Sequence, residues 1–181
     1  MTRDFNATPW ERVKIGNGIA HDAAKDGQMR AYAAAILKDC PRIDQLGAQW
    51  IARWIRKNCT YQQEAPGVEI LQGPYDSLKY RVVDCDDAAI LWTTLTRTAG
   101  IRGHMAGVGK ISTPDRFFHA VGYNEDDGKH YELSVDRRYG GNGWKGLYFT
   151  VKPQWATVVH DPSRDTFLRN VGGAGYRKVG E

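Results

Sequence analysis

Apolar residues in the first hundred positions recur at intervals of three and four, the spacing of a helix with one buried face. The clearest stripe predicts a helix over about residues 84–98. Its members are Cys85, Ala88, Ala89, Trp92, Leu95 and Ala99. A similar stripe predicts a helix over about residues 44–58, and a high alanine content predicts helices over about residues 19–26 and 28–38. Gly27 separates the two alanine-rich helices.

Beyond Gly100 the pattern changes to the alternation of apolar and polar residues that is typical of strands. The predicted strands are residues 104–110, 116–124, 130–136, 147–151 and 156–160. Residues 60–83, which contain Pro-Gly and Gly-Pro pairs, are expected to be irregular. Helices followed by strands favour an α+β fold, in which N-terminal helices pack on an antiparallel β-sheet.

The length of 181 residues and the 41% hydrophobic content suit one domain over residues 1–181 with a sizeable core. They exclude a disordered, collagen-like or disulfide-stapled chain. We expect residues 170–181 to form a flexible tail. The formal charge of +4 is spread along the chain without a basic cluster, so we expect no nucleic-acid partner.

No apolar run reaches the roughly 18 residues of a membrane span, and the N-terminus lacks the apolar segment of a signal peptide. We therefore expect a cytoplasmic protein without membrane association. Three cysteines are an odd number, which in such a chain favours reduced thiols over disulfides. Cys40 precedes a proline at a predicted helix end and Cys59 ends an apolar stripe, so both are interpreted as core residues.

Cys85 begins the predicted helix 84–98, with Asp84 as N-cap and Asp87 at the spacing of a capping box. The free N–H groups and dipole of a helix start favour a thiolate and can stabilise an oxyanion. The neighbouring aspartates, including Asp86, act against this because negative charge raises the pKa of a thiol. A catalytic Cys85 would therefore need a positive partner such as a histidine, and the alternative is a buried, space-filling cysteine.

A histidine partner emerges from the predicted hairpin around Asp127-Gly128, a strong signal for a two-residue type I′ turn. That turn places Tyr123 opposite Glu132 and His119 opposite Asp136, with Cβ atoms about 4.5–5.5 Å apart. A carboxylate beside an imidazole orients the ring and favours its charged form. The alternatives are a structural histidine and a strand-end aspartate, to which a one-residue error in register would lead.

Metal binding is the main rival chemistry for these side chains. The possible ligands are Asp84, Asp86, Asp87, His119 and Asp136. The sequence lacks the Cys/His spacing of a zinc site, so we expect neither a metal nor another cofactor.

The order Cys, His, Asp resembles the transglutaminase-like core of papain-type cysteine hydrolases. The resemblance rests on the segments 50–61, 84–101, 119–123 and 132–136 and spans about residues 28–136. The segment 67–74 is most like the phage and bacterial branch of transglutaminase-like cysteine peptidases. Val83 departs from the pattern, because the family usually has glycine before Asp-Cys.

The resemblance implies a peptidase or amidase in which Cys85 is the nucleophile, His119 the general base and acid, and Asp136 the orienting carboxylate. A thiolate attacks an amide or ester carbonyl to give an acyl-enzyme, which water or an amine then resolves. The implied substrate is a peptide, a protein or a peptidoglycan peptide.

Candidates for a second oxyanion donor are Gln72, Tyr75 and Tyr80. The alternative function is a non-catalytic structural or assembly protein that keeps the fold. Such a protein would have phage structural proteins as partners and would be incorporated in a virion.

Overall fold

The computed structural model describes residues 9–65, 70–110, 117–134, 148–151 and 176–178. The helices are α1 (Pro9–Ala23), α2 (Gly27–Leu37), α3 (Ile43–Asn58), α4 (Pro74–Tyr80) and α5 (Cys85–Thr98). The strands are β1 (Thr60–Tyr61), β2 (Val82–Val83), β3 (Gly103–Lys110), β4 (Phe117–Asn124), β5 (Lys129–Tyr131), β6 (Tyr148–Val151) and β7 (Tyr176–Lys178).

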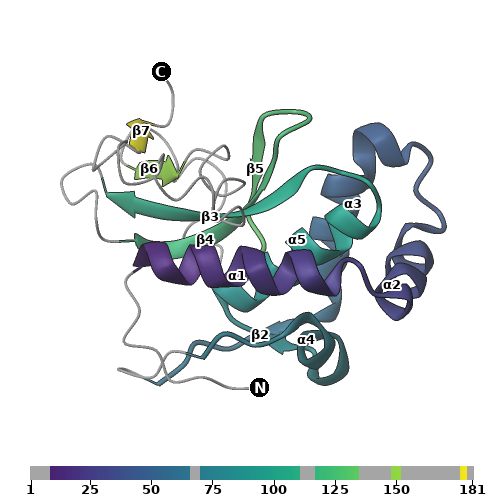
Figure 1. Cartoon of the computed structure of the whole chain (residues 1–181), viewed down its shortest axis with the longest axis horizontal. Helices are drawn as coiled ribbons and strands as arrows, with labels where there is room; N and C mark the ends of the chain where they lie inside the picture. The colour runs from purple at the N-terminus through teal and green to yellow at the C-terminus, as the bar shows by residue number, and fades with distance from the viewer. Residues whose placement is uncertain (1–8, 66–69, 111–116, 135–147, 152–175, 179–181) are drawn as a thin grey trace.

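The larger sheet is antiparallel and has the strand order β5-β4-β3-β6-β7, whereas β1 and β2 form a separate parallel pair. Figure 1 shows the helices grouped beside the long strands β3 and β4. The α+β class with N-terminal helices packed on an antiparallel sheet, which the sequence predicts, is therefore confirmed.

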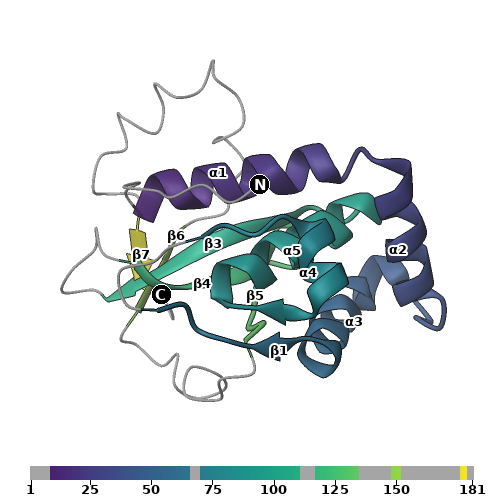
Figure 2. The ribbon, with the colours of Figure 1, turned by 90° about the horizontal axis from the view of Figure 1, so that it is seen from below.

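Helix α5 is the centre of the core and packs against the other four helices and against β3 and β4 (Figure 2). Its Trp92 is fully buried and donates from Nε1 to the carbonyl of Ala48 at 3.0 Å. The Trp92 ring stacks on Tyr131, with ring centroids 5.3 Å apart. It also requires a glycine at position 122, because a Cβ there would lie 2.5 Å from Trp92 Cε3. Helix α5 and β4 therefore approach closely.

Helix α1 is joined to β3 by the buried side chain of Asn17. Its Nδ2 donates to the carbonyl of Met105 at 3.0 Å, and its Oδ1 accepts from the N–H of Met105 at 3.0 Å. These two bonds satisfy backbone groups of β3 as a neighbouring strand would do, since buried backbone groups need partners. Asn17 thereby fixes α1 against the sheet.

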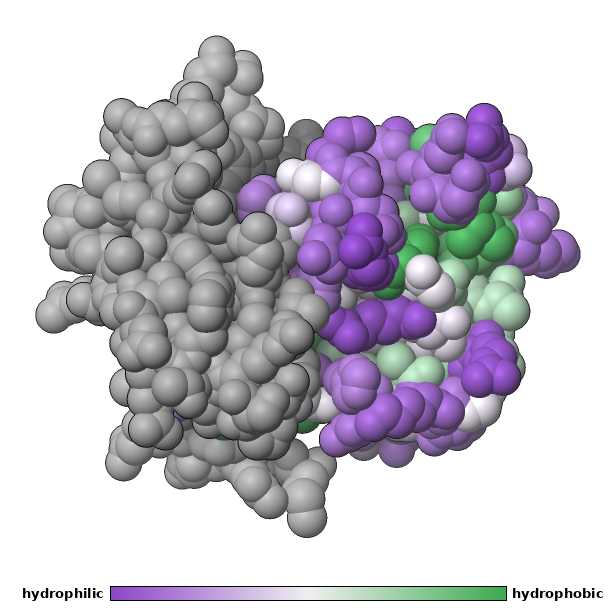
Figure 3. Space-filling view, turned by 45° about the horizontal axis from the view of Figure 1, so that its top comes forward, coloured by the Kyte–Doolittle hydropathy of each residue, from purple (hydrophilic) through white to green (hydrophobic). Residues whose placement is uncertain are grey.

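The surface in Figure 3 is mainly hydrophilic where residues are described, with a few apolar residues between the polar ones. The exposed large apolar side chains are Tyr32, Ile43, Leu46, Tyr80 and Val82. Among the described residues, none of the helices combines the length and the apolar composition that crossing a bilayer requires.

The helix ends follow local chemistry that the sequence carries. Asp26 is the N-cap of α2 and accepts from the N–H of Gln28 at 2.8 Å, so the predicted break at Gly27 is a helix start. Helix α1 begins ten residues earlier than the predicted helix 19–26. The prediction of an irregular segment over 60–83 is wrong for α4, which begins at Pro74 because proline suits the first helical position.

The predicted hairpin register is wrong. Tyr123 pairs with His130 and Asn124 with Lys129, so the strands are shifted by two residues from the predicted pairing with Glu132. The loop has four residues because Asn124 organises it: its Oδ1 accepts from Asp126 N–H at 3.1 Å and its carbonyl from Gly128 N–H at 2.9 Å. Gly128 supports this loop with a φ of 68°.

Some predictions lie partly or wholly outside the described residues. These are Asp136, the strand at 156–160 and most of the tail at 170–181. Within that tail, β7 pairs with β6.

Candidate active site

Cys85 is the first residue of α5, and the predicted capping box precedes it. The Oδ1 of Asp84 accepts from the N–H of Asp87 at 3.1 Å, and the Oδ2 of Asp87 accepts from the N–H of Asp84 at 3.5 Å. Asp87 also accepts from the N–H of Gln72 at 2.7 Å, which ties the preceding loop to the helix start. These bonds fix the backbone that presents Cys85.

The Cys85 sulfur lies against β4. It accepts from the N–H of Ala120, the residue directly after His119 and beyond the stretch of β4 that pairs with β5. The helix start and the histidine strand therefore meet at the thiol.

The thiol of Cys85 is neutral in this arrangement. Burial raises its pKa well above the usual range, Asp86 and Asp84 raise it further, and the hydrogen bond from Ala120 lowers it. Burial also raises the pKa of Asp84 to about 6 and that of Asp87 to about 7. Near neutral pH these two carboxyl groups consequently carry less than full negative charge. The sequence alone, in contrast, leads us to expect that the neighbouring aspartates are charged.

His119 is buried and faces a carboxylate. Its Nε2 lies 2.8 Å from Oε2 and 3.1 Å from Oε1 of Glu132. A carboxylate at Nε2 favours the tautomer with its proton there, which makes Nδ1 the basic nitrogen. Glu132 therefore orients the ring of His119, the role that the sequence resemblance implies for Asp136.

Glu132 is itself held in place. Its Oε1 accepts from the N–H groups of Leu133 and Ser134, both at 2.9 Å, and its own carbonyl accepts from the guanidinium of Arg56. Burial tends to raise the pKa of Glu132, but the hydrogen bond and charge of His119 together with the hydrogen bonds from Ser134 outweigh it, and the net pKa is lowered. Glu132 is thus an ionised, positioned carboxylate at neutral pH.

A profile of the transglutaminase-like superfamily matches residues 30–144, which include the Cys85 helix start, His119 and Glu132. The chain belongs to this superfamily. No curated protein is similar enough in sequence to count as a match.

Two solved structures are similar to this transglutaminase-like chain. A candidate protease from Parabacteroides distasonis has a TM-score of 0.55 at 16% identity, covering 78% of this chain and 29% of its own. A candidate cysteine protease from Cytophaga hutchinsonii has a TM-score of 0.45 at 18% identity, covering 59% of this chain and 37% of its own. The chain thus spans about a third of the length of these proteins. The first similarity confirms the transglutaminase-like fold.

The structure places the three predicted oxyanion donors in different surroundings. The amide of Gln72 donates to Ser77 Oγ and to the carbonyl of Val82, both at 3.0 Å. Tyr75 packs against the main core, and burial together with Asp26 raises its pKa to about 12. Tyr80 is 57% exposed at the end of α4. Of the three, Gln72 is the one whose backbone is tied to the capping box.

The same helix start holds a cluster with metal-ligand chemistry. Asp84, Cys85 and Asp86 can each offer a ligand atom within 4.8 Å of the others. Asp84 already accepts from Asp87 N–H as the N-cap, so a metal would compete with the cap. His119 and Asp87, two of the ligands considered from the sequence, are not in this group.

Glu132 is a site residue that the sequence pattern does not predict. The sequence places Glu132 in the predicted strand 130–136, but the predicted register pairs it with Tyr123 rather than with His119. The two-residue shift and the end of β5 at Tyr131 free Glu132 from that pairing and bring it to His119.

Proposed function

We propose that this protein is a cysteine-dependent amide hydrolase, a peptidase or amidase, that acts through a Cys85 acyl-enzyme. The observation that carries the proposal is the contact of His119 Nε2 with Glu132 at 2.8 Å, next to the strand residue that hydrogen-bonds Cys85. A thiol, an imidazole and an orienting carboxylate are the groups that nucleophilic acyl transfer needs.

In the proposed reaction His119 Nδ1 takes the proton of the Cys85 thiol as the sulfur attacks the substrate carbonyl carbon. The tetrahedral intermediate collapses, the C–N bond breaks, and His119 returns the proton to the leaving amine. Water, deprotonated by His119, then releases the acyl group as a carboxylic acid and restores the thiol. The raised pKa of Cys85 fits proton transfer during attack rather than a stored thiolate.

Stabilisation of the oxyanion falls to the start of α5. The first N–H groups of a helix have no partner within the helix, and those of Cys85 and Asp86 lie at this position. Two carboxylates are proposed to orient His119. Glu132 is proposed because it contacts the ring, and Asp136 because the family resemblance implies it. The acyl donor is proposed to be a peptide, a protein or a peptidoglycan peptide, and an amine could replace water as acceptor.

A second candidate function is a structural or assembly role without catalysis. Burial and the neighbouring acidic groups raise the pKa of Cys85, and this favours a structural role because it opposes a reactive thiolate.

A substrate-like electrophile distinguishes the two. A peptidyl chloromethyl ketone should modify Cys85 in the folded protein, since His119 activates the thiol only when a carbonyl is bound. Mass spectrometry of each cysteine provides the measurement. Partly buried Cys40 and buried Cys59 are the internal controls, and His119→Ala should slow the labelling of Cys85. Equal labelling of Cys85 and Cys40, or a rate unchanged by His119→Ala, would support the structural role.

A further inference from the structure

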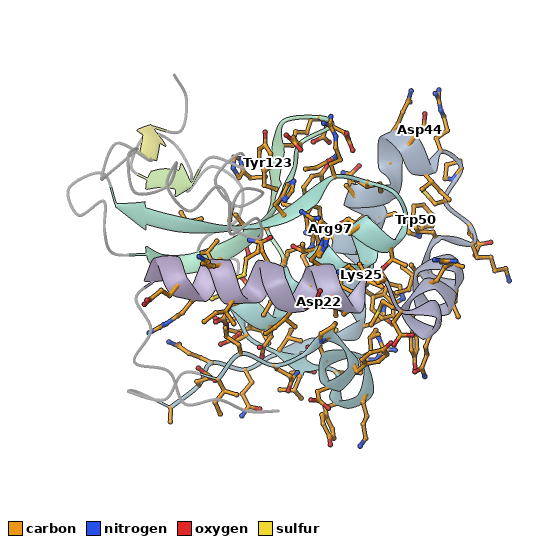
Figure 4. The ribbon with its side chains drawn as sticks, in the orientation of Figure 1. Asp22, Lys25, Asp44, Trp50, Arg97 and Tyr123 are labelled. Atoms are coloured by element: carbon orange, nitrogen blue, oxygen red, sulfur yellow. The ribbon has the colours of Figure 1, made fainter. Side chains whose placement is uncertain are left out.

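A cavity of about 430 Å³ lies at the opposite end of α5 from Cys85. Its charged and titratable lining consists of His21, Lys25, Arg97, Arg102, His104 and Glu125. Figure 4 shows the labelled side chains of Arg97 and Lys25 near one another, beside the C-terminal end of α1. Arg97 follows Cys85 by twelve positions in the helix, about 18 Å along the axis. The cavity is therefore separate from the candidate active site.

Arg97 is the half-buried cation of this cavity. Its Nε donates to the carbonyl of Gly103 at 2.8 Å, and its two terminal nitrogens face His21 Nδ1 at 3.4 Å and His104 Nδ1 at 2.6 Å. These partners are a carbonyl and two imidazoles, and none is acidic. A guanidinium keeps its charge at any working pH. Among the described residues, no carboxylate is hydrogen-bonded to this guanidinium, and Glu125 acts on it through its charge.

The rim of the cavity carries two further cations, each paired with a carboxylate. Lys25 pairs with Asp22 at 3.0 Å and Arg102 with Asp126 at 2.6 Å, and these are exposed pairs of small energy. Glu125 is the carboxylate of the lining, and it lies 3.5 Å from His104 and 3.7 Å from Arg102. Burial, Lys25 and Arg97 together lower the pKa of His21, and the charge of Asp22 acts in the opposite direction.

Helix α5 and strand β3 pack closely beside Arg97, and this packing with the bond to Gly103 positions the guanidinium. A Cβ at Gly103 would lie 1.9 Å from Thr96 Oγ1, so helix and strand touch where Arg97 holds the Gly103 carbonyl. His104 is buried, with a side chain 2% exposed, and supports the guanidinium from the other side. A preorganised donor loses little entropy on binding.

We propose that this cavity binds a small oxyanion, a phosphate or a carboxylate, with Arg97 as its principal partner. A guanidinium matches the geometry of both groups and donates to two oxygens at once. Lys25 and Arg102 at the rim attract the anion and can add contacts. The proposal does not rest on catalysis at Cys85.

The test titrates the purified full chain with inorganic phosphate, with succinate and with sodium chloride at matched ionic strength. The melting temperature should rise by several degrees and saturate with phosphate, succinate or both, because a ligand of the folded state stabilises it. Phosphate alone identifies a phosphate site, succinate alone a carboxylate site, and both a general oxyanion site. A chloride response equal to both would overturn the proposal.

Variants locate the effect. Arg97→Gln should reduce the affinity at least about tenfold, the loss of one strong charge-assisted contact. Lys25→Gln, at an exposed position that does not endanger folding, should reduce it about threefold. Lys57→Gln, an exposed cation on α3, is the matched control and should leave the affinity unchanged. In the wild type, phosphate or succinate should also shift the Arg97 Nε–H resonance, a measurement independent of any variant. Binding that is equally strong in the Arg97 and Lys57 variants contradicts the proposal.

Discussion

The two ends of the buried helix α5 carry side chains of opposite charge type. The N-terminal end presents a thiol among three carboxyl groups, and the C-terminal end presents a guanidinium among imidazoles. This order complements the helix dipole, which favours acids at the start and bases at the end. The middle, from Asp86 to Thr96, is buried and carries the packing. The two candidate sites therefore lie at the ends of α5, and the packing of the middle of the helix holds both ends in place.

The largest expected effect isolates the N-terminal end. Cys85→Ala should lower kcat/KM for amide hydrolysis at least about 10³-fold, equivalent to about 4 kcal/mol, because the nucleophile is removed. The melting temperature should change by only a few degrees. Hydrolysis assays on a peptide substrate measure the first quantity, and Cys40→Ala is the control that should retain full activity. Full activity in Cys85→Ala would show that Cys85 is not the nucleophile.

The next effect tests the centre that both ends share. Trp92→Ala should reduce the free energy of unfolding by about 3–5 kcal/mol, since it empties the contact with Gly122 and Tyr131. Urea denaturation measures it. Trp50→Ala is matched, because Trp50 also donates to a backbone carbonyl at 3.0 Å but is only partly buried. Its cost should be clearly smaller. Equal costs would contradict the central role of Trp92.

The N-terminal end was largely predictable from sequence because its geometry is local. Asp84 and Asp87 stand three residues apart, and that spacing alone defines a capping box whatever surrounds it. The main helices follow for the same reason, since an apolar stripe records which face is buried. The apolar pattern does not predict how burial affects the carboxyl groups of Asp84 and Asp87, whose pKa values are raised.

The rest depended on contacts between distant segments. Asp127-Gly128 indicated a two-residue turn, but the side chain of Asn124 caps a four-residue loop instead, and the register moved by two. Glu132 reached His119 only as a result of that shift. At the C-terminal end of α5, the sequence identifies Arg97 only as a basic residue in the last turn of a helix. Its contact with His21 joins residues 76 positions apart, which no local pattern records.

A smaller effect on activity distinguishes the two carboxylates proposed for His119. Glu132→Gln should lower kcat/KM about 10–100-fold, because the amide keeps a hydrogen bond but cannot stabilise the charged imidazole. The acidic limb of the pH–rate profile should move to lower pH, a change that a purely structural role would not cause. Asp136→Asn is the matched variant, and Glu11→Gln, an exposed glutamate on α1, is the control.

If Asp136→Asn shows the larger loss and the shifted limb, the orienting role belongs to Asp136 as family resemblance implies. If Glu132→Gln does, the contact at 2.8 Å identifies the working carboxylate. Unchanged profiles in both variants would contradict an orienting carboxylate altogether.

The last effect concerns the dependence of stability on pH, where the two ends of α5 again differ. Arg97 does not titrate in the working range, whereas the pKa of Asp87 is raised from 3.8 to about 7. Below pH 4 both folded and unfolded chains hold the Asp87 proton. As pH rises from about 4 to 7, the unfolded chain releases it first, so Asp87 makes folding less favourable over that window.

Asp87→Asn cannot ionise and keeps one oxygen, which can accept from the N–H of Gln72 or from that of Asp84 but not from both, because the two bonds use different oxygens of Asp87. Relative to wild type, the variant should therefore gain stability steadily from pH 4 to 7, against a cost of about 1 kcal/mol for a weakened cap. Urea midpoints at pH 4.5, 6 and 7.5 measure the difference. Asp44→Asn, an exposed first-turn aspartate on α3, should track the wild type with a constant offset. Parallel curves for Asp87→Asn would mean that burial does not perturb this carboxyl group, and the N-terminal end of α5 would then carry its full negative charge beside Cys85.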